Sequence, residues 1–390
     1  MVKTFRWSLL LPALLLISAC GNATPGSPAA EPTAAGSVAP TAAVVAAGDD
    51  LVVDKSRLTA ELRFFNWTDY ISPEIVSQFE TEYGVKLIVD NYDANEDMIA
   101  KVRAGNSGYD IVVPSDYAVD ILADDSQLQA LDKTLLPNMS YMEPSLLDKY
   151  FDKGNNYSVP YMYGITGIAY NAKSFPNGID SWSALFDTAQ LEPFRGQVSM
   201  LDDERETPGA VLKFLGQSLN NTDISNLTEV EQLLIAQKPL LAAYNSSDVN
   251  RKLASGEYVI AHAWNGMAMQ ARNGLGDDFA GNPDIRFVIP KEGGLIWMDN
   301  MAILKDSPNA YTAHVFMNFM MRPEVAAANA AYIGYLTPNK DGTALLPDDI
   351  KALYVEGFAP NDEMYKRLEW AERNETTAAF SRLWTTVKGE

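Results

Sequence analysis

The stretch Phe64-Phe65-Asn66-Trp67-Thr68-Asp69-Tyr70 lies at the point where the first strand of this 390-residue chain is expected to end. The apolar run from Leu62 to Phe65 predicts that strand. Ser72-Pro73-Glu74 follows, and a serine N-cap, a proline at the first helical position and an acid in the first turn predict a helix. Open α/β sheets bind ligands at the carboxyl ends of their strands. A tryptophan ring beside a carboxylate at that place is suited to an organic cation.

Strands and helices continue to alternate after this stretch. The pattern predicts a helix over 73–83, a strand over 85–89, a helix over 97–104 and a buried strand over 109–114. This β-α-β-α-β order predicts a doubly wound lobe with a parallel sheet.

Two later segments, 157–170 and 293–303, have the extended character expected of strands that cross to a second lobe and back. Roughly 330 residues of folded chain exceed one core of ordinary size, which favours two lobes. The pattern also predicts helices over 182–186, 208–219, 228–237, 310–320 and from 323 on, strands over 197–201, 258–264 and 285–290, and a helical C-terminal segment from 362.

The N-terminus has the pattern of an export signal. Lys3 and Arg6 precede an apolar run over 9–17 that is too short to span a bilayer. Ile17-Ser18-Ala19-Cys20-Gly21 resembles a bacterial lipobox, which implies cleavage before Cys20 and lipid attachment to its thiol. An ordinary secretory signal that happens to end in a cysteine is the alternative. We therefore expect a lipoprotein signal peptide over 1–19, followed by a lipid-anchored flexible tether over 20–57 that is rich in Ala, Pro and Thr.

Composition and motifs exclude several classes of ligand and of enzymatic activity. The formal net charge of −21 disfavours nucleic acid and anionic lipid and favours a cationic ligand. Cys20 is the only cysteine, so no internal disulfide can form. The chain has two histidines, His262 and His314, and no phosphate loop, metalloprotease motif or nucleophile elbow. We therefore expect no metal, no cofactor and no enzymatic activity.

Six blocks between residues 62 and 339 carry a family resemblance. They are FFNWTDY (64–70), YDIVVPSDYAVD (109–120), LDDERET (201–207), HAWNGMA (262–268), EGGLIWMDNMAI (292–303) and IGYLTPN (333–339). In order and spacing they resemble the spermidine/putrescine-binding proteins of bacterial ABC importers. The resemblance implies the α/β, type II periplasmic-binding-protein fold, with two doubly wound lobes joined by crossing segments and a ligand cleft between them. We expect lobe 1 over 58–163 and 298–343, and lobe 2 over 164–297 and 344–390.

The resemblance also implies a set of ligand-binding residues. Carried over position by position, they are Trp67, Thr68, Asp69, Tyr70, Ser115, Tyr117, Asp203, Glu206, Trp264, Trp297, Asp299 and Tyr335. Chemistry supports the set independently, because each buried ammonium of a polyamine needs a carboxylate or carbonyl, and its methylenes need apolar walls. Where the family places a Gln after a Glu-Trp pair, this chain has Ala371. Because alanine cannot hydrogen-bond an amine, this difference favours a diamine as the ligand.

The resulting hypothesis is an exported lipoprotein, on the periplasmic or extracellular face, that captures putrescine or spermidine as a monomer and delivers it to an ABC permease. Two other functions stay open: a polyamine sensor coupled to a membrane receptor, and a carbohydrate-active enzyme with paired carboxylates. Taken singly, each residue also has a plain structural explanation. Trp264 and Trp297 could be core aromatics, Asp69 a helix cap, and Tyr335 a loop anchor.

Overall fold

A computed structural model describes residues 51–276 and 279–389 of the chain. The predicted signal peptide (1–19), Cys20 and most of the predicted tether lie outside the described residues. Residues 51–57, the end of that tether, are folded. The backbone N–H of Asp54 donates to the Tyr311 hydroxyl (2.8 Å), and the Arg57 guanidinium lies 3.7 Å from the centre of the Tyr311 ring. The prediction that the tether reaches residue 57 is therefore wrong at its end, because these residues pack on the folded body.

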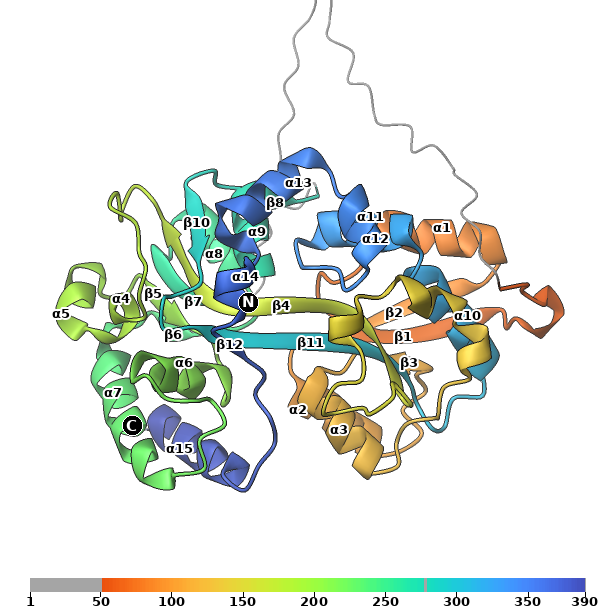
Figure 1. Ribbon diagram of the computed structural model, residues 1–390, viewed down its shortest axis with the longest axis horizontal. Coiled ribbons are helices and arrows are strands. Elements are labelled where there is room, and N and C mark those ends of the chain that lie inside the picture. Colours follow the sequence, from red (N-terminus) through yellow and green to blue (C-terminus); the bar gives the residue numbers. More distant parts are fainter. Residues whose placement is uncertain (1–50, 277–278, 390) are drawn as a thin grey trace, which may run out of the picture. The chain divides into compact units, whose positions relative to one another are not determined.

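One mixed sheet joins the two lobes (Figure 1). Its strands are β1 (Glu61–Trp67), β2 (Lys86–Tyr92), β3 (Ile111–Val112), β4 (Ser158–Asn171), β5 (Val198–Met200), β6 (Ala243–Tyr244), β7 (Ile260–Trp264), β10 (Ile285–Val288), β11 (Gly294–Ile303) and β12 (Leu368–Glu369). Within the described chain their order is β2-β1-β3-β11-β4-β7-β5-β6, with β10 on β4 and β12 on β11. A separate small hairpin pairs β8 (Gly274–Leu275) with β9 (Phe279–Ala280).

Lobe 1 is built on the parallel strands β2, β1 and β3. Its helices are α1 (Pro73–Tyr83), α2 (Asn95–Arg103), α3 (Asp116–Asp124), α10 (Ala310–Met320) and α11 (Pro323–Ile333). Helix α1 has the predicted bounds, because the Ser72 side chain accepts a hydrogen bond from the Glu74 N–H and Gly84 adopts a left-handed conformation (φ 70°) just past the end. The predicted doubly wound arrangement of this lobe is confirmed.

Lobe 2 has β7, β5 and β6 as its parallel strands. Its helices are α4 (Ser183–Phe186), α5 (Thr188–Leu191), α6 (Glu206–Phe214), α7 (Leu227–Gln237), α8 (Val249–Ser255), α9 (Asn265–Asn273) and α15 (Thr377–Gly389). A separate apolar core, which includes Trp182, Ile260 and Trp384, lies inside this lobe.

The C-terminal segment differs from the prediction of a continuous helix from 362. After α11 the chain forms α12 (Lys340–Leu345), α13 (Asp348–Leu353) and a π-helical turn (Tyr354–Phe358). From 362 on it forms α14 (Asp362–Tyr365) and β12 before α15. The helix prediction is wrong over 366–376 because Leu368 and Glu369 pair with β11 instead. The Glu369 carboxylate also accepts from the Lys213 ammonium and the Ser218 hydroxyl, which fixes the strand against lobe 2.

The strands β4 and β11 run antiparallel from one lobe into the other (Figure 1). Trp297 pairs with Gly164 and Asp299 with Met162, and the register shifts between Asp299 and Asn300. The predicted lobe boundaries at 163/164 and 297/298 fall inside these two strands. No helix in the described part of the chain is long and apolar enough to cross a membrane.

Candidate ligand-binding site

A cavity of about 370 Å³ lies between the two lobes. It forms where the chain leaves β1, β3, β5 and β7 at their carboxyl ends, as expected for parallel strands in α/β proteins. All the residues that the sequence predicts for ligand binding line it: Trp67, Thr68, Asp69, Tyr70, Ser115, Tyr117, Asp203, Glu206, Trp264, Trp297, Asp299 and Tyr335. The structure therefore brings together residues that lie as far apart in the sequence as Trp67 and Tyr335.

Asp299 is a buried carboxylate on the lobe 1 side, with 5 % of its surface exposed. Its Oδ2 atom accepts a hydrogen bond from the Tyr70 hydroxyl (2.8 Å), and its Oδ1 atom accepts one from the Ser115 hydroxyl (2.6 Å). Burial raises the pKa of Asp299 to about 7, although both hydrogen bonds oppose the rise. No lysine or arginine among the described residues pairs with it. The described chain therefore supplies no counter-ion to an ionised Asp299.

Glu206, the first residue of α6, is the corresponding buried carboxylate on the lobe 2 side. Its Oε1 atom accepts a hydrogen bond from the Trp264 indole N–H (3.0 Å), whereas its Oε2 atom is buried with no partner in the described chain. Burial, and then the neighbouring charge of Asp203, raise the pKa of Glu206 to about 8. The Oδ1 atom of Asp203 accepts from the backbone N–H groups of Arg205 (2.8 Å) and Glu206 (2.9 Å). Asp203 therefore stays in place beside Glu206.

Aromatic rings form the walls between these carboxylates. The ring of Trp297 lies 6.2 Å from that of Trp264 and 5.5 Å from that of Tyr335, and both pairs meet edge to face. The rings of Trp297 and Tyr335 reach these positions because glycines face them. A Cβ atom at Gly164 would lie 2.2 Å from Trp297, and one at Gly266 would lie 2.4 Å from Tyr335. The explanation of Trp264 and Trp297 as ordinary core aromatics is therefore insufficient, because both line an open cavity.

Asp69 does not cap α1, since Ser72 does so. Asp69 has a left-handed backbone (φ 56°), and its Oδ2 atom lies 3.5 Å from a guanidinium nitrogen of Arg251 on α8 of lobe 2. The nearby Trp67 donates its indole N–H to the Val113 carbonyl (2.9 Å), which fixes that ring at the end of β1.

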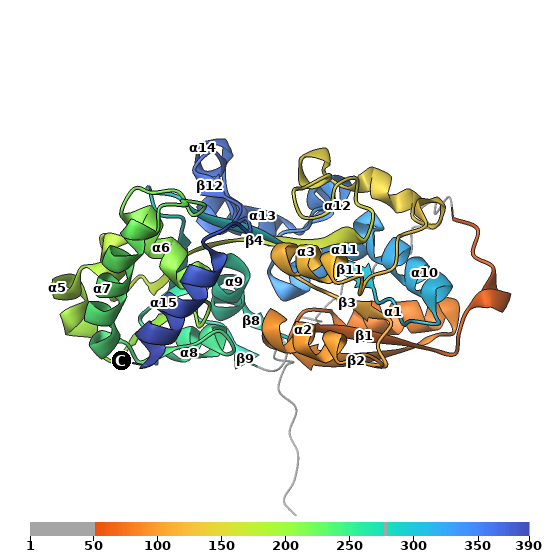
Figure 2. The ribbon, with the colours of Figure 1, turned by 90° about the horizontal axis from the view of Figure 1, so that it is seen from below.

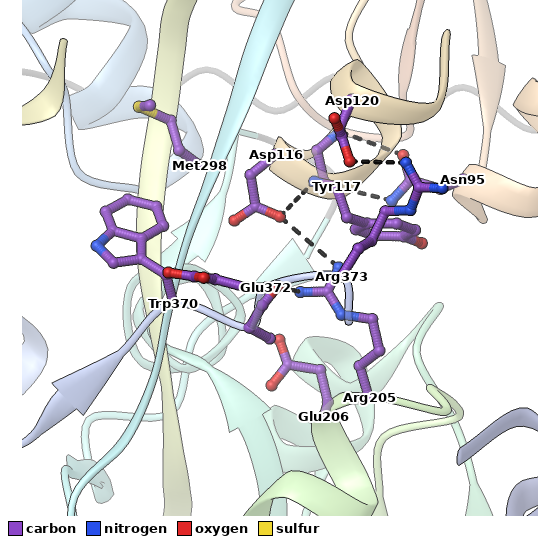
Figure 3. Close-up of polar contacts among 12 residues, drawn as sticks. Asn95, Asp116, Tyr117, Asp120, Arg205, Glu206, Met298, Trp370, Glu372 and Arg373 are labelled. Carbon is purple, nitrogen blue, oxygen red and sulfur yellow. Dashed lines mark hydrogen bonds and ion pairs between the residues drawn. The ribbon is translucent and has the colours of Figure 1, made fainter. Parts of the chain in front are cut away.

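The sequence reasoning missed an ion pair that joins the lobes, between the buried Asp116 and the partly buried Arg205. Asp116, the first residue of α3, is 3.7 Å from the Arg205 guanidinium, which also lies 4.0 Å from the centre of the Tyr117 ring (Figure 3). The Tyr117 hydroxyl donates to Glu96 (2.8 Å). Asp116 and Arg205 belong to two of the six quoted blocks, but nothing in the sequence indicates that they pair with each other.

Ala371 does not line this cavity. It lines a second one of about 290 Å³ that borders α2, α3 and α6. Its carbonyl accepts from the Arg205 guanidinium (3.0 Å) and the Tyr150 hydroxyl (3.1 Å). In the same segment after β12, Arg373 donates a hydrogen bond to Asp120 of α3 (2.6 Å; Figure 3). The segment after β12 therefore contacts both lobes. The described residues include no group of three or more His, Cys, Asp and Glu side chains that could hold a metal ion.

Comparisons with known proteins agree with this geometry. The model of the family described as bacterial extracellular solute-binding protein matches residues 74–353. The chain is 37% identical over 334 residues to a putrescine/cadaverine-binding protein of Pseudomonas aeruginosa, covering 84% of this chain and 93% of that protein. It is 38% identical over 325 residues to the spermidine/putrescine-binding periplasmic protein of Escherichia coli K12, covering 82% and 88%.

A solved structure adds the three-dimensional match. The substrate-binding protein of a spermidine/putrescine ABC transporter from Streptococcus pneumoniae has a TM-score of 0.73 and 32% identity, over 85% of this chain and 99% of that one. This likeness confirms the predicted two-lobed periplasmic-binding-protein fold. With a family model over most of the folded part and relatives of this identity and coverage, the chain belongs to the spermidine/putrescine-binding family of bacterial extracellular solute-binding proteins.

Proposed function

We propose that this protein captures a polyamine, putrescine or spermidine, in the cavity between its lobes and delivers it to an ABC permease. One observation supports this above all. Asp299 and Glu206 are buried on opposite sides of an aromatic cavity, and neither has a basic partner among the described residues. Burying an unpaired carboxylate is costly, so two of them facing one cavity favour a ligand with two positive charges.

The walls suit the rest of such a ligand. Methylene groups between two ammonium groups gain from burial against Trp297, Trp264 and Tyr335, and a cation above a desolvated tryptophan face gains about 2 kcal/mol. The names of the relatives from P. aeruginosa and E. coli point to the same ligand class. Membership in a solute-binding family confirms that the chain is not an enzyme, so the carbohydrate-active alternative is wrong.

Calorimetric titration with a matched ligand series tests the proposal. Putrescine, 1-aminobutane and 1,4-butanediol share a four-carbon chain and differ in having two, one or no ammonium groups. We expect putrescine to bind about a hundredfold or more tightly than 1-aminobutane, because each buried carboxylate needs its own counter-ion. The diol should not bind. Equal affinity for putrescine and 1-aminobutane, or no binding of putrescine and spermidine, would refute the proposed ligand class.

Anchoring and delivery belong to the same proposal. The lipobox-like run that ends at Cys20 supports export and lipid attachment. In cells fed a labelled fatty acid, the full chain should acquire label, and Cys20→Ser should not. Cells that lack the protein should take up labelled putrescine more slowly, and the intact chain should restore uptake. Unlabelled wild-type chain would refute the anchor, and unchanged uptake would refute delivery.

A further inference from the structure

Asp69 differs from the other three carboxylates that the sequence assigned to the ligand. It already has a cationic partner, the Arg251 side chain, 3.5 Å away. Asp203, Glu206 and Asp299 form no ion pair in the described part of the chain. The Asp69 pair also crosses the cleft, because Asp69 follows β1 of lobe 1 and Arg251 belongs to α8 of lobe 2.

The surroundings of Arg251 hold it at the edge of the cavity. Its guanidinium carbon lies 4.7 Å from the centre of the Phe279 ring, on the hairpin of β8 and β9. Figure 2 shows this hairpin on the side of lobe 2 that faces α2 of lobe 1. On α8, the preceding Asn250 is buried and donates to Gln270 (2.6 Å), which anchors the helix. The side chains of Arg251 and Asp69 are 40% and 35% exposed, so they meet at the mouth of the cavity.

Among the carboxylates that the sequence assigned to the ligand, this pairing leaves two charge positions inside the cavity. One is Asp299 on the lobe 1 side, and the other is the neighbouring pair Asp203 and Glu206 on the lobe 2 side. The cavity is also lined by Asp93, Glu96, Asp202 and Glu204. A third ammonium placed at Asp69 would meet the positive charge of Arg251. Like charges that share one counter-ion disfavour each other.

We propose that Arg251 is a specificity-determining residue that occupies the place of a third ammonium at Asp69 and so favours diamines over triamines. This inference rests on the proposed polyamine-binding function. Arg251 then determines how long a polyamine the site prefers, although it lies outside the six blocks of the family resemblance.

The test measures dissociation constants of putrescine and spermidine for the wild type and for Arg251→Gln, which keeps a polar side chain and removes the charge. Spermidine affinity relative to putrescine should rise about fivefold, the upper range for a partly exposed ion pair. Arg251→Lys retains the charge and should keep a ratio near that of the wild type. Arg195→Gln is the matched control. Arg195 pairs with Glu192 on the exposed surface of lobe 2, and its variant should leave the ratio unchanged.

A second variant shows whether Asp69 mediates the gain. In the Arg251→Gln background, Asp69→Asn should remove the added spermidine affinity, because the freed counter-ion is then lost. An Arg251→Gln ratio no different from that of Arg195→Gln, with unfolding temperatures that show both variants folded, would overturn the inference while polyamine binding stands. Failure of the wild type to bind either amine would instead overturn the proposed function.

Discussion

Replacing Asp299 by Asn tests the proposed site most directly, because the change removes one charge and nearly no volume. The side chain is 5% exposed and held by the Tyr70 and Ser115 hydroxyls. Either hydroxyl can turn to accept from the new amide group, so the local packing is preserved. Breaking a buried ion pair by removing one partner costs about 3–5 kcal/mol. At about 1.4 kcal/mol per factor of ten, putrescine affinity should fall by roughly a hundredfold to a thousandfold or more.

The same substitution should stabilise the ligand-free protein above neutral pH. Burial raises the folded-state pKa of Asp299 from its ordinary value of 3.8 to about 7. The native state therefore holds this proton more tightly than the unfolded state, so stability is lost as pH rises from about 4 to 7. The loss from this one group is roughly 4 kcal/mol once it is complete. Asn cannot ionise and should avoid that loss.

Titration calorimetry with putrescine measures the first effect, and thermal unfolding without ligand at pH 5 and pH 8 measures the second. Asp125→Asn is the control, because Asp125 lies on the surface at the end of α3, where it pairs with Arg103 (2.7 Å). Equal losses of affinity in both variants would remove Asp299 from the site. An Asp299→Asn variant that loses stability between pH 5 and pH 8 as steeply as the wild type would refute the raised pKa.

Three further results follow from the site. Putrescine should bind more tightly as pH rises from 6 to 8.5 and release protons near pH 7, because the cation favours the ionised forms of Asp299 and Glu206, whose pKa values are about 7 and about 8. Calorimetry in buffers of different ionisation enthalpy measures this release, and a heat independent of buffer would contradict it. Gly266→Ala should weaken binding about tenfold or more, because the new Cβ would lie 2.4 Å from the Tyr335 ring. Gly389→Ala is its control, because a Cβ atom there meets no other atom within 4 Å. Equal putrescine affinities of the two variants would argue against a role of the Tyr335 ring in binding. Added salt should lower affinity, since the net charge of −21 attracts a cation through solvent; a dissociation constant independent of salt would exclude that attraction.

The elements that the sequence predicts well are those with complete local signals. Helix α1 begins and ends where Ser72, Pro73 and Gly84 place its caps. Helix α10 also has the predicted bounds, although Asn309 makes no side-chain capping hydrogen bond. By contrast, α9 begins directly after β7 and was not predicted, because Asn265-Gly266 has the composition of a turn. The helix contains a glycine at 266 because only a residue without a side chain lets the Tyr335 ring approach α9. That requirement comes from residues far away in the sequence.

At the site, too, the sequence pattern predicts some features, whereas others depend on how the residues pack. The family blocks located the residues that line the cavity, but not the state of their charges. Asp69 and Asp299 are both acids in such blocks. The structure pairs the first with Arg251 at the mouth and buries the second without a cation from the described chain. Arg251 itself lies in no quoted block, and its guanidinium reaches Asp69 only because α8 packs beside the cleft. Sequence patterns identify residue types at a site, whereas burial and pairing depend on the assembled lobes.

Burial of these carboxylates connects stability with ligand binding. Asp299 lies on β11 next to the register shift that separates it from Asn300, and this strand belongs to both lobes. Its hydrogen bonds to Tyr70 and Ser115 orient the carboxylate, and they do not replace a counter-ion. Ionisation of Asp299 therefore destabilises the ligand-free protein, and a dication removes that cost at the place where the lobes join. A neutral isostere such as Asn should make the free protein more stable and the binding weaker. The same carboxylate thus reduces the stability of the free protein and supplies the affinity for the proposed ligand.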